Sequence, residues 1–158
     1  MNYCIRTNSL NEDFRKLVTK LDAYLKICDG KEHLFYAQLN KTEDIKNVVI
    51  SYDDGQPIGC GAVREYSYEI MEVKRMYVLP HKRGQGIASS ILKELELWTV
   101  ELNFKKCILE TGKNQSEAIQ FYKKNGYNII PSYGHYLNIE NSVCFEKMLE
   151  NITIDSNN

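Results

Sequence analysis

The 158-residue sequence has no long apolar segment, almost no net charge and no cluster of prolines or glycines. No stretch approaches the roughly 20 apolar residues that a bilayer requires, so we expect no membrane partner. The formal net charge is −1, so no global field favours nucleic acid or an anionic membrane, and any anion site must be local. Without repeats or a linker, we expect a single domain over residues 1–150 and a polar C-terminal tail over residues 151–158.

The cysteines are odd in number and widely spaced, and they contain no CxxC pair; they are Cys4, Cys28, Cys60, Cys107 and Cys144. Most lie beside apolar residues, which favours buried free thiols in a reducing compartment over disulfides. The first sixteen residues also lack the apolar run of a signal peptide. We therefore expect a cytoplasmic protein.

Three segments have apolar residues at helical spacing, at residues 9–30, 87–102 and 114–126. Ser9 with Glu12, and Asn114 with Glu117, have the spacing of capping boxes, which predicts where the first and third helices begin. Gly126 stands where a left-handed cap ends the third helix. Residues 31–40 fit either a further short helix or an ordered loop.

Short β-branched and aromatic runs predict strands at residues 3–7, 48–52, 58–66, 70–79, 106–111, 127–130 and 143–149. The three strands from residue 48 to residue 79 are joined by short turns, which predicts an antiparallel meander. A helix separates the strand ending at Leu79 from the strand at 106–111, so these two strands are expected to be parallel neighbours. The fold class is therefore α+β, with a mixed sheet.

The segment PHKRGQGIASSIL, residues 80–92, joins the meander to the second helix. Its two glycines allow positive φ and let backbone amides approach a ligand, and a helix N-terminus offers unpaired N–H groups. Lys82 and Arg83 add positive charge, and no acid opposes them. The segment predicts a site for a phosphate or pyrophosphate, and its structural alternative is a flexible basic turn.

Two other nucleotide-binding patterns do not fit this segment. A P-loop needs a Lys-Ser or Lys-Thr pair, and none follows Gly86. A dinucleotide fingerprint needs a third glycine within a βαβ unit, but Ser89 stands at that position and the preceding strands form a meander.

The sequence resembles the GNAT N-acetyltransferases at two signatures. Arg83-x-x-Gly86-x-Ala88, preceded by VKRMYV at residues 73–78, is similar to the acyl-CoA signature of that superfamily. The second signature is matched by Asn114, Ala118, Tyr122 and Asn125-Gly126-Tyr127. The resemblance spans residues 58–130. It implies the GNAT fold, which is a six- to seven-stranded, mostly antiparallel sheet with helices on both faces and a splayed parallel strand pair.

The resemblance implies acetyl-CoA as co-substrate, with no metal. In the family, backbone amides of the loop cradle the pyrophosphate, which here implies Arg83, Gly84, Gln85, Gly86, Ile87, Ala88 and Ser89. The pantetheine arm pairs with the backbone of the preceding strand, at Met76, Tyr77 and Val78. The amide of Val78 is the candidate donor to the thioester oxygen, and Asn114 is the counterpart of a pantetheine contact.

The resemblance also implies catalytic residues. An alkylamine has a pKa near 10.4, so a base or a water path must remove a proton before it attacks the thioester. Tyr122 matches the family's proton donor to the leaving sulfur, and its structural alternative is a core aromatic. Glu72 is the candidate base, because in a regular strand it shares a face with Met76 and Val78. Its alternative is an ion-pair role, and Glu110 is the second candidate base.

The acceptor side of the family is built from the first helices, the central strands and the loop before the last strand. The candidate acceptor residues here are His33, Tyr36, Glu65, Tyr133, His135 and Tyr136. We expect an N-acetyltransferase that acts on a small primary amine, such as an amino acid or a polyamine, and that binds no nucleic acid. The alternatives are a protein lysine or N-terminal acetyltransferase and a non-catalytic acyl-CoA-binding regulator. A homodimer is a further option, with the last strand as its exchange edge.

Overall fold

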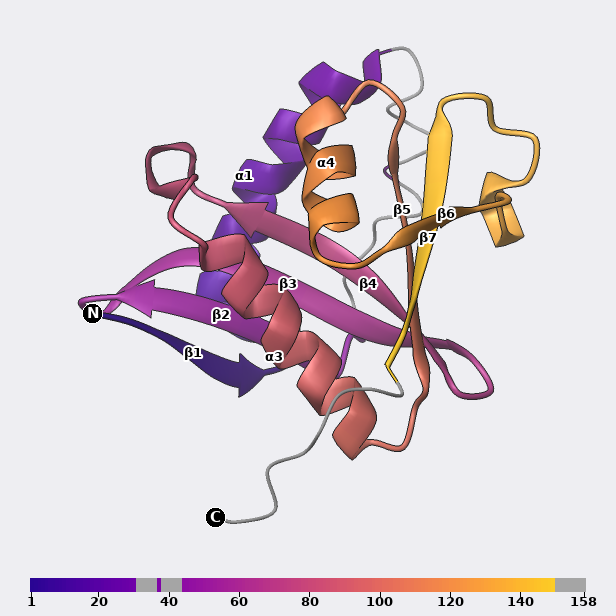
Figure 1. The fold of residues 1–158 in the computed structure, drawn as a ribbon. Helices are drawn as coiled ribbons and strands as arrows, with labels where there is room; N and C mark the ends of the chain where they lie inside the picture. The colour runs from indigo at the N-terminus through magenta and orange to yellow at the C-terminus, as the bar shows by residue number, and fades with distance from the viewer. Residues whose placement is uncertain (31–36, 38–43, 150–158) are drawn as a thin grey trace.

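The computed structural model describes residues 1–30, 37 and 44–149. Within these residues the chain forms a seven-stranded sheet in the order β1-β2-β3-β4-β5-β7-β6 (Figure 1). The strands are β1 (Asn2–Thr7), β2 (Asn47–Asp53), β3 (Gln56–Ser67), β4 (Ile70–Val78), β5 (Lys106–Gly112), β6 (Asn128–Ile130) and β7 (Ser142–Met148). Neighbouring strands are antiparallel apart from β4 and β5, which are parallel. The predicted meander and parallel pair are confirmed.

Three expectations concern residues outside the described part of the chain. The choice between helix and loop for residues 31–40 depends almost entirely on such residues. The candidate acceptor residues His33 and Tyr36, and the tail at 151–158, also lie outside the described residues.

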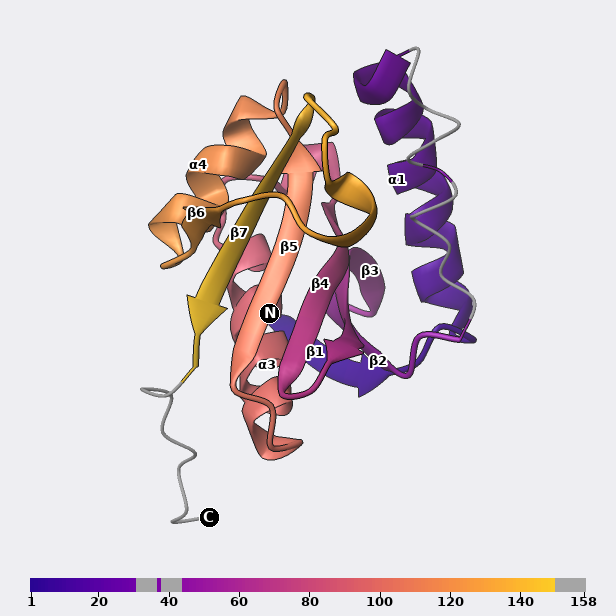
Figure 2. The same ribbon diagram turned by 90° about the vertical axis from the view of Figure 1, so that its right-hand side faces the viewer.

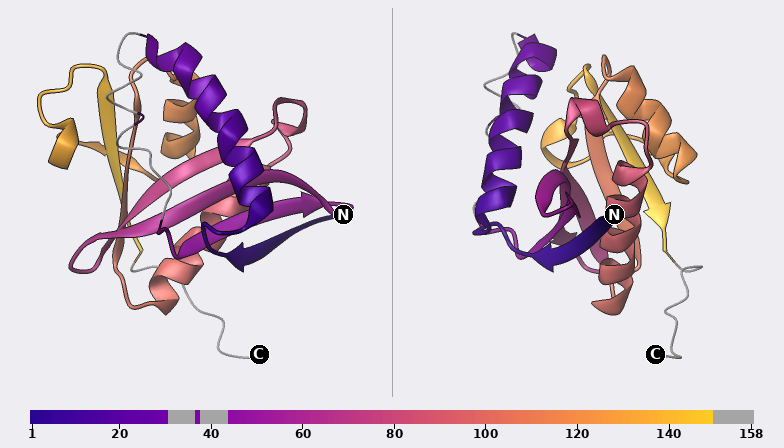
Figure 3. Two further views of the ribbon diagram at one scale, coloured as in Figure 1. Left: turned by 180° about the vertical axis from the view of Figure 1, so that it is seen from behind. Right: turned by 90° about the vertical axis from the view of Figure 1, so that its left-hand side faces the viewer.

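The helices of the described residues cover both faces of the sheet, as predicted. They are α1 (Glu12–Asp29), α3 (Ile87–Glu101) and α4 (Ser116–Lys124), with the short 3-10 turns η2 (Pro80–Lys82) and η3 (Gly134–Tyr136). Helix α1 crosses one face, and α3 and α4 lie on the other (Figure 2, Figure 3). Among the helices described, none is both long enough and apolar enough to span a membrane.

Each face of the sheet packs its own apolar core. On the α1 side, Phe14 of the helix packs with Ile50 of β2, and both side chains are fully buried. On the other side, Ile91 of α3 packs in a cluster with Phe145 of β7. Val49 belongs to the α3 side although it adjoins Ile50, because successive side chains of a strand point to opposite faces.

Two helices begin at residues other than those the sequence predicted. The N-cap of α1 is Asn11, whose side chain accepts from the Phe14 amide at 3.1 Å, whereas the Ser9 amide is used in a bond to the Ile45 carbonyl. Helix α4 begins after Gln115, whose amide turns back to the Gly112 carbonyl at 3.0 Å, and the helix has no side-chain cap bond. Both capping-box predictions are therefore wrong, although both helices exist.

The end of the third helix follows the prediction, and so does the state of the cysteines. Gly126 has a φ of 91°, in the left-handed region where glycine is favoured. All five cysteines are free; three of them are buried and two half-buried.

The parallel pair β4–β5 is splayed. Its register joins only three residue pairs, the last of which is Glu72 with Ile108. Beyond that point the strands separate toward their C-terminal ends, on the side from which the loop to α3 leaves β4 (Figure 1). The separation leaves the inner edge of β4 facing a gap between the two strands.

β4 also contains a β-bulge at Arg75, where φ is 60°. Lys74 pairs with Ala62 of β3, whereas Tyr77 pairs with Cys60. Three steps along β4 therefore correspond to two along β3, and β4 has one extra residue at this point. An extra residue reverses the alternation of side chains beyond it.

The bulge corrects the expected position of Glu72. Met76 and Val78 pack into the core on the α3 side. Glu72 precedes the bulge, and its register places it on the α1 side instead. The bulge also brings the adjacent side chains of Lys74 and Arg75 to this α1 side, where Arg75 contacts the helix. The expectation that Glu72 shares a face with Met76 and Val78 is therefore wrong.

The last strand is not an edge of the sheet. β7 pairs with β5 along its whole length, and β6 covers its other side at Asn128–Ile130. Among the described strands, β1 and β6 form the two edges. The prediction that β7 is an edge available for exchange between subunits is wrong.

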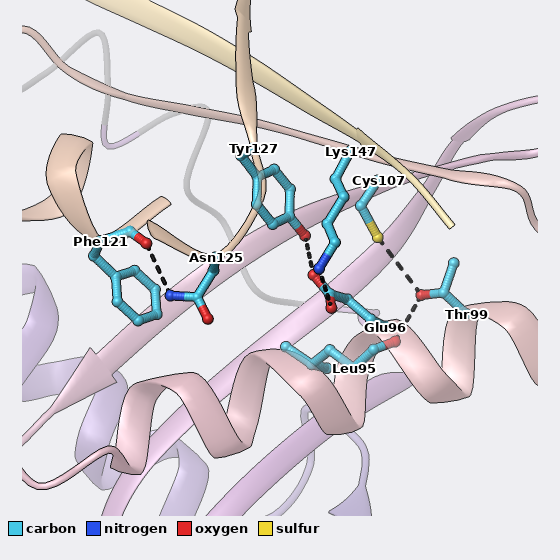
Figure 4. A network of polar contacts seen from close by, with 8 residues as sticks. All are labelled: Leu95, Glu96, Thr99, Cys107, Phe121, Asn125, Tyr127 and Lys147. Atoms are coloured by element: carbon cyan, nitrogen blue, oxygen red, sulfur yellow. Dashed lines mark hydrogen bonds and ion pairs between the residues drawn. The ribbon is translucent and has the colours of Figure 1, made fainter. Parts of the chain in front are cut away.

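A buried polar network links α3 to the strands beyond β5. The carboxylate of Glu96, which is 2% exposed, accepts from the Tyr127 hydroxyl at 2.8 Å and pairs with the Lys147 ammonium at 2.9 Å (Figure 4). The Tyr127 ring in turn contacts the ring of Tyr122, with 5.7 Å between their centroids. The network therefore helps to fix the position of Tyr122.

Candidate active site

A pocket of about 720 Å³ lies where β4 and β5 diverge. Its walls come from α1, β4, the loop before α3, the end of β5, and α4. The predicted coenzyme-binding and catalytic residues that line it are Glu72, Met76, Tyr77, Val78, Arg83, Gly84, Gly86, Ile87, Ala88, Ser89, Asn114 and Tyr122. Gln85 is exposed and lies outside the lining. One cavity therefore joins the glycine loop to the candidate catalytic residues.

The loop before α3 presents backbone amides to this pocket. Gly84 and Gly86 have φ angles of 77° and 79°, which a side chain would strain, and a Cβ at either position would point into open space. Gly86 is the N-cap of α3, with no side-chain cap bond and no acid in the first turn. The amides at the start of a helix have no acceptor within it, so residues 87–89 present donors where the helix dipole is positive. The loop fits the pyrophosphate of coenzyme A.

The basic side chains of the loop are tied to the sheet. The Lys82 ammonium pairs with Asp53 at 2.8 Å. Arg83 donates from Nε to the Val78 carbonyl at 2.9 Å, and its guanidinium lies 5.4 Å and 5.6 Å from the ring centres of Tyr24 and Tyr77. The positive charge of Arg83 therefore faces the pocket without an acidic ion-pair partner among the described residues, whereas Asp53 offsets the charge of Lys82.

The backbone of β4 turns toward the gap between the strands. The Leu79 amide donates to the Ile58 carbonyl of β3 at 2.9 Å. Peptide groups of successive residues in a strand point to opposite sides, so the amide of Val78 points away from β3 and toward β5. The amide of Met76, two residues earlier, points the same way. These are the positions at which the family resemblance places the pantetheine arm.

Tyr122 projects from α4 into the pocket and is buried. Its ring contacts those of Phe121, Tyr127 and Phe145. Burial, together with the charge of Glu110, raises the pKa of the Tyr122 phenol far above its ordinary value. The hydroxyl therefore stays protonated at physiological pH and is available to donate a hydrogen bond or a proton.

Two carboxylates line the pocket, one from each of the splayed strands. Glu72 of β4 accepts from the Tyr133 hydroxyl at 2.6 Å, and its other oxygen lies 3.7 Å from the Lys74 ammonium. Burial raises the pKa of Glu110 on β5 to about 8, and the charge of Lys74 opposes this effect. Burial lowers the pKa of Lys74, against the opposing charge of Glu72. Each carboxylate therefore bonds to a tyrosine of the β6–β7 loop, Glu72 to Tyr133 and Glu110 to Tyr136, and burial raises the pKa of Glu110.

The loop between β6 and β7 covers these carboxylates. The Tyr133 ring makes edge contacts with Tyr66 at 5.1 Å and with Tyr136 at 5.6 Å. Tyr136 is 5% exposed and lines the pocket. Burial and the nearby carboxylates raise the pKa of both loop tyrosines, so both hydroxyls stay protonated. Two other candidate acceptor residues, Glu65 and His135, are exposed and lie outside the lining.

Some lining residues were not among the predicted site residues. Leu21, Tyr24 and Leu25 of α1 line the pocket, as do Lys74 and Arg75 of β4. The apolar spacing that predicts α1 also marks Leu21 and Leu25, but as core residues. The place of Arg75 depends on the bulge, and an arginine with positive φ has no local sequence signal.

Comparison with known proteins identifies the family. Residues 44–129 match the family model of the acetyltransferase (GNAT) domain. The chain belongs to the GNAT acetyltransferases. It is 32% identical over 149 residues to an IAA acetyltransferase of Azospirillum brasilense, covering 91% of this chain and 95% of that protein.

Solved structures agree with this assignment. A Klebsiella pneumoniae structure assigned as an acyl-CoA N-acyltransferase matches this GNAT chain with a TM-score of 0.79 and 27% identity, over 94% of this chain and 98% of the other. The PaiA N-acetyltransferase of Thermoplasma acidophilum, solved with coenzyme A, shares the fold with a TM-score of 0.66 and 17% identity, covering 94% and 99% of the two chains. The predicted GNAT fold is confirmed.

This GNAT enzyme is therefore an acyltransferase that uses acetyl-CoA. The amides of the glycine loop and the inner edge of β4 are the groups that would hold the coenzyme. The described residues contain no group of three or more histidine, cysteine or acidic side chains arranged to hold a metal ion.

Proposed function

We propose that the enzyme transfers the acetyl group of acetyl-CoA to the primary amine of a small molecule, by direct attack within a ternary complex. The observation that carries the proposal is the cover over the acceptor end of the pocket. Tyr133 bonds to Glu72, and the buried Tyr136 lines the cavity. A flexible protein segment needs an open groove, whereas a covered pocket suits a small acceptor. We place the reaction in the cytoplasm, consistent with the five free cysteines.

The acceptor end favours an amine. Glu72 and Glu110 present two carboxylates, which attract an alkylammonium group and desolvate it between them. Glu110 is the proposed proton acceptor, because its pKa of about 8 is near neutrality. Glu72 is the proposed binding group for the ammonium, and its hydrogen bond with Tyr133 and its ion pair with Lys74 fix its position.

The coenzyme end supplies the other catalytic groups. Acetyl-CoA brings a thioester carbonyl that the amine attacks, and the products are an amide and the thiol of coenzyme A. The amide N–H of Val78 points into the gap and donates to the carbonyl oxygen as that atom gains negative charge. The Tyr122 hydroxyl donates its proton toward the departing sulfur. The neutral state that burial enforces on Tyr122 suits this role.

Release of free thiol from acetyl-CoA tests the proposal. The assay compares amino acids, polyamines, aminoglycosides and a lysine peptide as acceptors, with an Arg83→Ala/Gly86→Asp double variant as the control. Thiol release with one class of small amine, lost in the double variant, is the expected result. Transfer to the lysine peptide alone would assign the enzyme to protein acetylation. Thermal stabilisation by acetyl-CoA without transfer to any acceptor would support the regulator instead.

A further inference from the structure

We propose that Arg75 binds a carboxylate of the acceptor, so that the enzyme selects small amines that also carry an acid group. This inference rests on the proposed function, because it names the class of the small amine. It separates the two classes of candidate acceptor, because amino acids carry a carboxylate and polyamines do not.

The guanidinium of Arg75 is buried but poorly satisfied. Its side chain is 1% exposed, and Nη2 donates to Asp22 of α1. Nε and Nη1 have no hydrogen-bond partner among the residues that the structure describes. A buried donor is normally paired, and charged groups are almost never buried without full pairing. The unpaired N–H groups therefore indicate a partner that enters from the pocket, which Arg75 lines.

The position of Arg75 suits the second end of an acceptor. The bulge places Arg75 on the same side as Lys74 and Glu72, facing α1 rather than the α3-side core. Cα atoms in a regular strand are about 3.3 Å apart per residue, and the bulge shortens this rise, so Arg75 lies less than about 10 Å along β4 from Glu72. Leu21 and Leu25 of α1 form an apolar wall of the same cavity. A small molecule with a few carbon atoms between its two charged groups spans this distance.

The charges on this side of the pocket are arranged by sign. Glu72 and Glu110 are acidic groups of the part covered by the β6–β7 loop. Lys74 forms an ion pair with Glu72, and Arg75 has two buried donors without a partner among the described residues. Nε–H and Nη1–H of Arg75 can each donate a charge-assisted hydrogen bond, which a carboxylate accepts more strongly than a neutral amide and which an ammonium group cannot accept. An acceptor with an amine at one end and a carboxylate at the other matches this arrangement.

Matched pairs of acceptors test the inference. The pairs are β-alanine, 4-aminobutanoate and lysine against β-alaninamide, 4-aminobutanamide and lysinamide, so that each pair differs in the carboxylate alone. We expect the wild type to prefer the acids by roughly tenfold to a hundredfold in kcat/KM, as loss of a hydrogen bond to a charged group implies. Arg75→Gln should remove this preference through the KM of the acceptor, with the KM of acetyl-CoA unchanged.

Two further variants serve as controls. Arg15→Gln removes an exposed arginine of α1 that lies outside the pocket lining, and it should keep the preference. Asp22→Asn keeps Arg75 and removes the acid that shares its charge, so it should lower the KM of the acids. Because Arg75→Gln should remove the preference and Asp22→Asn should strengthen it, a general loss of folding in Arg75→Gln cannot imitate the result. Equal use of acids and amides by the wild type, or an unchanged preference in Arg75→Gln, overturns the inference and leaves the proposed function intact.

A binding measurement separates failure of the inference from failure of the proposed function. N-acetyl-β-alanine and its amide are titrated into the enzyme in the presence of coenzyme A, and the thermal midpoint is followed. We expect stabilisation by the acid only, and its loss in Arg75→Gln. If no amine is acetylated but this difference remains, the proposed reaction fails and the carboxylate site stands. If the acid and the amide stabilise equally, the carboxylate site is wrong whatever the activity.

Discussion

The two ends of the pocket are built from different parts of the chain. The coenzyme end is built from the backbone of residues 84–89. Two glycines with positive φ and the start of α3 leave the amides of this segment without acceptors inside the helix, so they are available to a ligand. The acceptor end is built from side chains of β4, β5 and the β6–β7 loop, which meet only in the folded protein. The coenzyme end is therefore encoded in one short segment, whereas the acceptor end depends on how three elements pack.

This difference has a consequence for specificity. Backbone amides bind a phosphate whatever side chains surround them, so the coenzyme end tolerates sequence change outside its glycines. Each proposed acceptor contact depends on a particular side chain, such as Glu72 or Tyr136. Substitutions at the acceptor end should therefore change which amine is used, and substitutions at the coenzyme end should change whether any transfer occurs.

The largest effect is expected from Gly86→Asp at the coenzyme end. An aspartate there strains a φ of 79° and places a negative charge among the amides that we propose bind the pyrophosphate. Loss of two charge-assisted hydrogen bonds lowers kcat/KM for acetyl-CoA by about 1,000-fold. Steady-state kinetics and thermal stabilisation by acetyl-CoA measure this loss.

Gly55→Asp is the matched control for that variant. Gly55 has a φ of 80° and open space around its missing Cβ, but it lies in the turn between β2 and β3. The same backbone strain should leave the KM of acetyl-CoA unchanged. Equal losses in the two variants would show that strain, rather than the anion site, causes the effect.

Tyr122→Phe is expected to lower kcat by about 100-fold, the scale of general acid catalysis. The substitution keeps the ring contacts with Tyr127 and Phe145 and removes only the hydroxyl. The KM of acetyl-CoA and the thermal midpoint should change little.

Tyr127→Phe gives the opposite pattern and controls for the loss of a buried hydroxyl. The Tyr127 hydroxyl donates to the buried Glu96 carboxylate, so its loss should lower the free energy of unfolding by roughly 1–3 kcal/mol. The ring contact with Tyr122 remains in the variant, so its kcat should stay near the wild-type value at a temperature where both proteins are folded. A full-rate Tyr122→Phe enzyme would remove Tyr122 from the mechanism.

Glu110→Gln tests the acceptor end through pH. Glu110 must lose its proton before it can accept one, so wild-type kcat/KM should rise as the pH increases through about 8. The variant should lose this rise, and its kcat/KM above about pH 8 should be about tenfold lower than that of the wild type, because Glu110 no longer accepts the proton. A pH profile that is the same in both proteins would exclude Glu110 as the base.

The same residue affects stability with a defined sign. Folding raises the pKa of Glu110 from 4.5 to about 8, so the folded state binds the proton more tightly than the unfolded state does. Its contribution to the free energy of unfolding is complete below about pH 4.5 and falls as the pH rises to about 8. Glu110→Gln should flatten this part of the stability profile in denaturant titrations.

The comparison of the two ends also explains what could be predicted from the sequence. The glycine loop and the strand order follow from local patterns, because turns, alternation and helix starts depend on neighbouring residues. The face of Glu72 was predicted wrongly, since a single extra residue at Arg75 reverses the alternation and arginine gives no signal for a bulge. The capping residues of α1 and α4 were also wrong, because competing backbone bonds decide them.

The smallest effect is expected from Tyr133→Phe, which tests whether the acceptor end is positioned by its cover. The hydroxyl bonds to Glu72 at 2.6 Å, while the ring contacts with Tyr66 and Tyr136 remain in the variant. Loss of one hydrogen bond should raise the KM of the amine about threefold, with kcat and the KM of acetyl-CoA nearly unchanged. Tyr68→Phe, at a tyrosine that is 86% exposed, should have no effect. If Tyr133→Phe instead weakened acetyl-CoA binding as much as amine binding, the two ends would be coupled, and the division between a backbone end and a side-chain end would fail.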